Sequence, residues 1–143
     1  MTADGTFELR EHTADVGVAA TGPTLGAAFA AVADGLAAAQ SDDVAESGDR
    51  FDLTVRAEGR EALLFDYLDE LVYQRDVRNV LPVDHEATVE RDAGDGDEWV
   101  LTGTARGVPL GEIHAREVKA VTYSEMRIEE TDDGWEIYVV FDV

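Results

Sequence analysis

The chain contains no cysteine, so neither a disulfide bond nor a thiolate metal site can form in it. Long hydrophobic runs are also missing. The longest lies between Ala27 and Ala33, and it is far too short and alanine-rich to cross a bilayer. Met1–Gly5 has neither the basic nor the apolar region of a signal peptide. We therefore expect a cytoplasmic protein that does not insert into membranes.

Basic residues are scarce. The 143 residues include 11 Lys and Arg against 32 Asp and Glu, which gives a formal net charge of −21. A surface of this sign repels phosphates, so strong direct binding of RNA or DNA is not expected. The acidic residues are spread along the whole chain instead of forming a tail. A salt-rich cytosol that screens their repulsion, as in a halophilic archaeon, is the simplest explanation.

Lysine is almost absent, because ten of the eleven basic residues are arginine and Lys119 is the single exception. Two interpretations remain open. Either arginine is favoured throughout and one lysine was retained by chance, or this position needs a compact ammonium group with three donors. A planar guanidinium does not replace such a group.

A hydrophobic content of 45% in 143 residues predicts one folded domain, spanning residues 1–143, with a proper core. Two segments have helical periodicity. The first begins after a candidate N-cap at Thr24, and glycine and alanine give it a small side that favours close packing on a sheet. Its bulky apolar positions are Leu25, Phe29, Val32 and Leu36. Those of the second segment are Leu63, Leu64, Tyr67, Leu68 and Leu71.

The other apolar residues mostly alternate with polar ones in short runs, which is typical of half-buried strands. These runs lie at about residues 7–10, 16–20, 51–58, 80–90, 99–106, 119–128 and 135–142. Pro82 places the fourth run at a sheet edge or makes its start irregular. The segment Gly107–His114 has little periodicity and is expected to form a loop. Two helices with six or seven strands predict an α+β fold with a mostly antiparallel sheet.

Common catalytic motifs are missing. There is no glycine-rich phosphate loop and no nucleophile elbow. The three histidines, His12, His85 and His114, lack the short spacing of a zinc site. His85 lies inside an expected strand, which favours a structural role. His12 and His114 flank irregular segments and remain candidates for a function.

Carboxylates are the remaining candidates for chemistry. The segment Glu11–Asp15 combines two carboxylates, an imidazole and a hydroxyl between two expected strands, and loops on a rigid scaffold often carry function. Asp15 and Asp142, with a carbonyl or terminal oxygen, would form a hard-oxygen site for Ca²⁺ or Mg²⁺. The alternative is that Asp15 caps a turn and Asp142 is a frayed terminus. The last strand is strongly apolar up to Phe141, which holds Asp142 and Val143 close to the core.

Several segments together are similar to one known family. They are Glu11–Gly17, the helix start with Thr24, Leu25, Ala28 and Phe29, then Leu63–Leu71, Val118–Tyr123 and the closing Phe141–Val143. These segments resemble the archease family, in the right order and over nearly the whole chain. The usual histidine after the tyrosine is replaced here by Ser124, so we assign no role to that position.

The resemblance implies a function and a site. Archeases are protein cofactors of the tRNA-splicing RNA ligase and not enzymes themselves. They assist guanylylation, the metal-dependent transfer of GMP from GTP to a histidine of the ligase, and so allow multiple turnovers. Asp15, Asp142 and Val143 would bind a divalent metal, usually Ca²⁺, with Mg²⁺ or Mn²⁺ as alternatives. His12 and Lys119 would lie nearby, and Lys119 would contact a nucleotide phosphate or an acidic group of the ligase.

Two other functions stay open at this point. One is a stand-alone metal-dependent hydrolase that uses Asp15, Asp142 and His12. The other is a general chaperone or interaction module for RNA-processing proteins. Turnover by the isolated protein would indicate the first, and binding that is indifferent to metal would indicate the second.

Overall fold

The computed structural model describes residues 5–11, 15–41, 46–92, 98–113 and 115–143. Two α-helices and seven strands form within these ranges, and all strand pairs are antiparallel. The predicted α+β fold is therefore confirmed. The elements are β1 (Thr6–Glu11), β2 (Asp15–Gly22), α1 (Leu25–Gln40), β3 (Arg50–Ala57), α2 (Arg60–Arg78), β4 (Val80–Asp92), β5 (Glu98–Pro109), the 3₁₀ helix η1 (Leu110–Glu112), β6 (Ala120–Thr131) and β7 (Gly134–Asp142).

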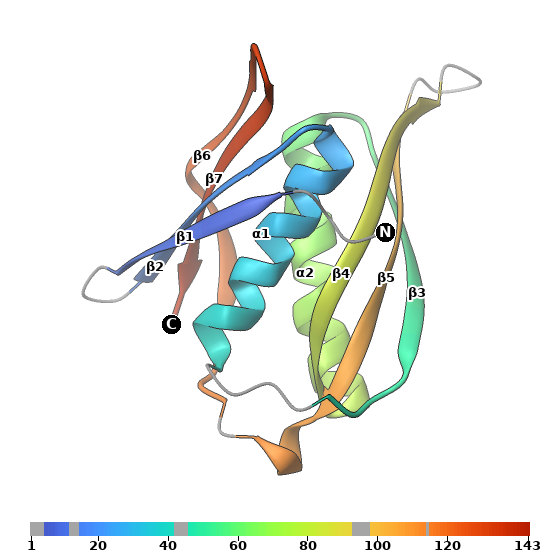
Figure 1. Ribbon diagram of the computed structural model, residues 1–143, viewed down its shortest axis with the longest axis vertical. Coiled ribbons are helices and arrows are strands. Elements are labelled where there is room, and N and C mark those ends of the chain that lie inside the picture. The colour runs from blue at the N-terminus through green and yellow to red at the C-terminus, as the bar shows by residue number, and fades with distance from the viewer. Residues whose placement is uncertain (1–4, 12–14, 42–45, 93–97, 114) are drawn as a thin grey trace.

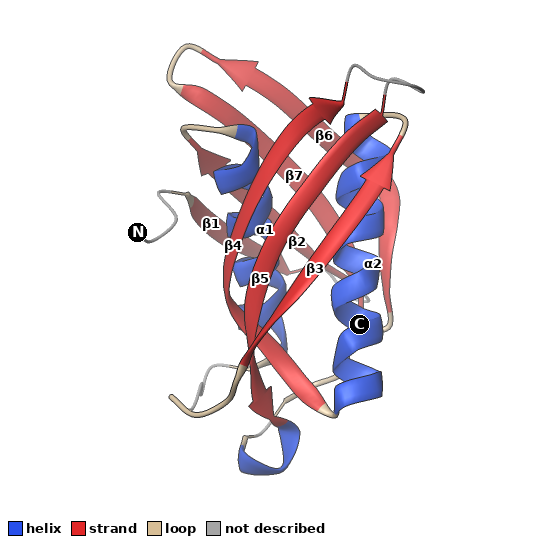
Figure 2. Ribbon diagram, turned by 90° about the vertical axis from the view of Figure 1, so that its right-hand side faces the viewer, coloured by secondary structure: helices blue, strands red, loops and turns tan. Residues whose placement is uncertain are grey.

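The strands divide between two sheets, a separation that strand-by-strand periodicity does not reveal. Sheet A has the order β1-β2-β7-β6 and sheet B has the order β3-β5-β4. Figure 1 shows both helices lying between the sheets, and Figure 2 shows sheet B in front of the helices with sheet A behind them. The protein thus has three layers, with the hydrophobic core on both sides of the helical layer.

Helix α1 is rich in alanine and glycine because it is covered on two sides. Thr24 caps it as predicted, and its hydroxyl accepts a hydrogen bond from the main-chain nitrogen of Ala27 at 3.1 Å. Gly26 and Gly35 are nine residues apart, which places them on opposite faces of a helix. A Cβ at Gly26 would approach Ala87 of sheet B, and one at Gly35 would approach Val18 of sheet A. Small residues on both faces let the two sheets approach the helix closely.

Gly26→Ala is expected to destabilise the fold by about 1–3 kcal/mol, the usual cost of overpacking, although alanine is the better helix former. The new Cβ would lie 2.5 Å from the main-chain oxygen of Ala87, which cannot rotate away. Gly111→Ala is the control, because a Cβ there meets nothing within 4 Å. Chemical unfolding measures both variants. An unchanged midpoint for Gly26→Ala would contradict the close contact between α1 and sheet B.

Helix α2 buries the predicted apolar stripe and ends at Arg78. The residue that caps it, Asn79, adopts a left-handed conformation with a φ of 56°. The stripe residues Leu63, Leu64 and Leu68 are fully buried. Within the described ranges, neither helix combines the length and the apolar character that crossing a bilayer requires.

Two details of sheet B bear on the sequence predictions. Pro82 lies in β4, which is an edge strand as expected, and the register of β4 shifts after Val83. The expected loop beginning at Gly107 is wrong in its first residues, because β5 continues to Pro109. Val108 pairs with Leu81 and both side chains are fully buried, so burial extends the strand beyond its alternating pattern.

Candidate metal centre

Asp15 and Asp142 lie directly opposite each other at one end of sheet A. Asp15 is the first residue of β2 and Asp142 is the last residue of β7, and the two are register partners. Directly opposed residues of an antiparallel pair project from the same face, with Cβ atoms about 5 Å apart. The structure therefore brings together two carboxylates that are separated by nearly the whole chain.

The core fixes this arrangement. Val16 pairs with Phe141 and Val18 pairs with Val139, and all four side chains are almost completely buried beneath the acidic pair. A shift of one residue would turn these apolar side chains away from the helices. Burial of the apolar partners therefore holds the acidic residues in register on the opposite face.

Asp142 is paired on both sides, which argues against a frayed terminus. Besides Asp15 on β2, its register partner on β6 is Ala120. Its main-chain oxygen also accepts a hydrogen bond from the nitrogen of Lys119 at 2.8 Å. The side chain of Asp142 is exposed, while Asp15 and Val143 are partly buried.

The electrostatics of the pair favour a cation. Like charges placed directly opposite each other on a sheet are destabilising. In addition, Oδ1 of Asp15 is buried and has no hydrogen-bond partner, and an unsatisfied buried polar group costs about 1–3 kcal/mol. A divalent ion would relieve both costs, and oxygen ligands are those that Ca²⁺ and Mg²⁺ prefer. The residues present thus fit a hard cation.

Main-chain oxygen atoms would supply the ligands beyond the two carboxylates. In the described part of the chain, no group of three or more His, Cys, Asp or Glu side chains is arranged to hold a metal. Val143 follows Asp142 directly and offers a main-chain oxygen instead of a side chain of these types. His12 and His114, both candidates from the sequence, lie outside the described residues.

Comparison with known proteins agrees with this fold. Residues 7–143 match the model of the archease protein family. The chain belongs to the archease family. The archease of Pyrococcus furiosus is 36% identical to it over 146 residues, and the match covers 96% of this chain and 98% of that protein.

Two solved structures are similar to this archease. The solution structure of Methanobacterium thermoautotrophicum protein 1598 is 32% identical with a TM-score of 0.76, and the match covers 96% of this chain and 98% of the other. A crystal structure from Thermotoga maritima, described as an archease and possible chaperone, has a TM-score of 0.61. It is 20% identical and covers 95% of this chain and 96% of the other, so it supports the fold alone.

Lys119 lies at the same end of sheet A in this archease. Its side chain is exposed, and its main-chain nitrogen binds the oxygen of Asp142. The family resemblance implied that this single lysine lies near the acidic pair, and the structure places the main chains of Lys119 and Asp142 in contact. The exposed side chain of Lys119 is accessible from solvent at this end of the sheet.

A buried arginine to which the sequence predictions gave no role supports this end of the archease. Arg75 is only 8% exposed. From Nη1 it donates to Oε1 of Gln40 at 2.8 Å and to the main-chain oxygen of Val118 at 3.3 Å. These bonds tie both helices to the segment that leads into Lys119. Arg75 follows Leu71 by four residues, so its position on the apolar stripe of α2 was the signal available in the sequence.

His85 belongs to a different part of the archease. It lies in β4 of sheet B and is only 3% exposed, and its Nε2 is 3.2 Å from the main-chain oxygen of Pro82. Its main-chain nitrogen donates to Oδ1 of Asp34 at 3.1 Å. Burial lowers the pKa of His85 to about 4 and raises the pKa of Asp34 to about 6. The burial of His85 and its contacts with Pro82 and Asp34 support a structural role for this residue, as expected from the sequence.

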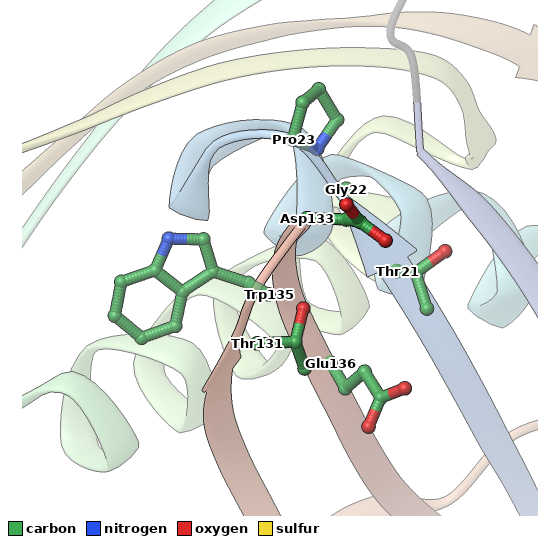
Figure 3. A pocket seen from close by; sticks show the side chains of 7 residues that line it. All are labelled: Thr21, Gly22, Pro23, Thr131, Asp133, Trp135 and Glu136. Atoms are coloured by element: carbon green, nitrogen blue, oxygen red, sulfur yellow. The ribbon is translucent and has the colours of Figure 1, made fainter.

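A hollow of about 550 Å³ lies at the far end of the β2–β7 pair. Figure 3 shows the carboxylates of Asp133 and Glu136 on the side of Thr21, while the Trp135 ring points the other way. Trp135 pairs with Gly22, seven residues along β2 from Asp15, or roughly 23 Å at the rise of a strand. The hollow and the acidic pair are therefore separate features of this archease.

Proposed function

We propose that this protein activates the tRNA-splicing RNA ligase. In this role it assists the metal-dependent guanylylation of the ligase and its multiple turnover during tRNA splicing, and it acts in the cytoplasm as a protein cofactor and not as an enzyme. Membership of the archease family supports the proposal. The observation that carries it is the pairing of Asp15 with Asp142 at the exposed end of sheet A.

The paired residues would hold the metal as follows. Asp15 and Asp142 would bind a divalent ion, Ca²⁺ first and Mg²⁺ or Mn²⁺ as alternatives, through their carboxylates, and Val143 would bind through a main-chain oxygen. When bound, the ion would supply positive charge of the kind that neutralises phosphates in nucleotidyl transfer. The protein itself provides the rigid strand ends that fix the two carboxylates and the adjacent Lys119.

The charge of the chain supports a division of labour with the ligase. A net charge of −21 disfavours a direct grip on RNA. The ligase would therefore bind the tRNA halves, and this protein would contact the ligase through the end of sheet A. Lys119 would then meet a nucleotide phosphate or an acidic group of the ligase, where a compact ammonium suits the contact.

A guanylylation assay tests the proposal. We expect the wild type to stimulate transfer of GMP from GTP to the ligase in high salt. Asp15→Asn and Asp142→Asn are expected to lower that stimulation at least tenfold, because an amide does not supply the charge that the ion needs. Asp52→Asn, at an exposed position of β3, is the matched control and should stimulate normally.

Three outcomes separate this proposal from its alternatives. Full stimulation by both site variants would contradict the role of the acidic pair. Hydrolysis of nucleotides by the isolated protein with Mg²⁺ or Mn²⁺ would instead indicate a hydrolase. Equal suppression of client aggregation by the wild type and Asp142→Asn, without any effect on GMP transfer, would indicate a general chaperone.

A further inference from the structure

The face of sheet A that points away from the helices carries a tyrosine close to the acidic pair. Alternation along β2 and β7 turns Val16, Val18 and Phe141 into the core, so Asp15 and Asp142 project from the other face. Tyr138 is four residues before Asp142 on β7 and therefore shares this outer face. Its register partner on β2 is Ala19.

Gly17 provides the space in which the tyrosine lies. A Cβ at Gly17 would meet the hydroxyl of Tyr138 and would lie 2.8 Å from Cζ of its ring. A contact that close is not compatible with any other residue at position 17 unless the tyrosine moves. The conformation of Gly17 does not need glycine, since its φ is not in the left-handed region. Space for the phenol is thus the physical reason for this glycine.

The side chain of Tyr138 points along the sheet toward the acidic pair. Its main chain pairs with Ala19, yet its hydroxyl lies over Gly17, two residues closer to Asp15. Asp15 is the next residue on this face of β2, about 7 Å further along the strand. The hydroxyl therefore lies at the end of the ring that is nearer to Asp15.

Arg127 helps to hold the ring in place from the other side. It is the register partner of Tyr138 on β6, and its guanidinium carbon lies 6.0 Å from the centroid of the tyrosine ring. Arg127 also forms an ion pair of 3.4 Å with Glu129. The ring is thus positioned by a neighbour on each adjacent strand.

We propose that Tyr138 is a positioning residue of the candidate metal centre and that Gly17 is present to admit it. The hydroxyl of Tyr138 donates a hydrogen bond to a bridging solvent molecule, which donates in turn to a carboxylate oxygen of the Asp15–Asp142 pair and orients that oxygen for the ion. A phenol is a suitable donor for a carboxylate. Donors of this kind commonly change metal affinity by 10–100-fold. The inference rests on the metal site of the proposed function.

Calcium titration of the isolated full chain in constant high salt tests this role. Tyr138→Phe keeps the ring and removes the donor, so we expect about tenfold weaker binding with an unchanged unfolding midpoint in the absence of calcium. Gly17→Ala is expected to weaken binding at least as much, because its methyl group displaces the phenol. Tyr73→Phe, at a tyrosine of α2 that is 58% exposed, is the control and should bind as the wild type does.

Calcium binding by the double variant Gly17→Ala with Tyr138→Phe, and by the wild type, distinguishes the ways in which this inference could fail. If Tyr138 acts from the space over Gly17, adding Tyr138→Phe to Gly17→Ala should cause little further loss of calcium affinity, because the effects of coupled residues are not additive. Tight calcium binding by both Tyr138→Phe and the wild type would overturn this inference and leave the proposed function intact. Failure of the wild type to bind any divalent ion would overturn the proposed metal site and this inference together.

Discussion

Asp142→Asn is expected to raise the stability of the calcium-free protein and to remove the stabilisation that calcium gives to the wild type. Without the ion, Asp142 faces Asp15 directly across β2 and β7. Removing one of two opposed like charges relieves about 0.2–1 kcal/mol. With the ion at one hundred times its dissociation constant, the wild type should gain about 2.7 kcal/mol. The variant should lose that gain, so the order of the two proteins reverses when calcium is added.

Chemical unfolding with chelator and with excess calcium measures this reversal. Asp52→Asn is the control, because Asp52 is exposed on β3 and has an apolar neighbour on each side in the chain. It should shift neither midpoint. A variant that is less stable than the wild type in chelator would contradict the repulsion between Asp15 and Asp142. A variant that calcium stabilises as much as the wild type would show that the acidic pair does not hold the ion.

Asp34→Asn is expected to stabilise the protein at neutral pH, by about 1–3 kcal/mol, and to have little effect at pH 4. The carboxyl of Asp34 has an ordinary pKa of 3.8, and burial raises it to about 6 in the folded protein. Its contribution to stability is therefore full below about pH 4 and is lost as the pH rises through 6. An amide at this position carries no charge to bury, and its oxygen still accepts the hydrogen bond from the nitrogen of His85.

His85 gives the opposite slope in the same range. Its ordinary pKa of 6.5 is lowered to about 4 by burial, so its contribution is full above pH 6.5 and is lost as the pH falls through 4. In the wild type the slopes of Asp34 and His85 oppose each other between pH 4 and 6. Asp34→Asn leaves the His85 slope uncompensated, and the stability of the variant should fall more steeply on acidification.

Unfolding free energies at several pH values in constant salt test this opposition. The difference between Asp34→Asn and the wild type isolates one carboxyl from the many others that titrate in this acidic chain. Other charged groups that act on the pair are Asp84 and Arg50, which stay unchanged in the variant. A difference that is the same at pH 4.5 and pH 7 would contradict the pKa shift of Asp34.

Local physical rules predicted most of the elements of this fold. Three features could be predicted because each depends on neighbours in the sequence. They are the cap at Thr24, the apolar stripe of α2 and the apolar side chains of β7. The division of the strands into two sheets could not be predicted from the sequence. It depends on α1 being covered on both sides, for which the alanines, Gly26 and Gly35 were only an ambiguous signal.

Only part of the candidate site could be predicted from the sequence. Residue types made Asp15 and Asp142 candidate ligands. No periodicity predicts that these two residues pair across the chain, and only the family resemblance implied that they form one site. The role of Arg75 was not predicted, because a position on an apolar stripe gives no sign of buried hydrogen bonds. Tyr138 and Gly17 were missed because their contact crosses two strands and depends on register, which single strands do not specify.

Calcium stoichiometry of the isolated protein tests the central claim most directly. Isothermal titration of the chelator-treated wild type in high salt should show one ion bound per chain. The double variant Asp15→Asn and Asp142→Asn should bind none, with its fold verified by an unfolding transition as cooperative as that of the wild type. One calcium ion bound per chain in the folded double variant would contradict a metal centre between the ends of β2 and β7.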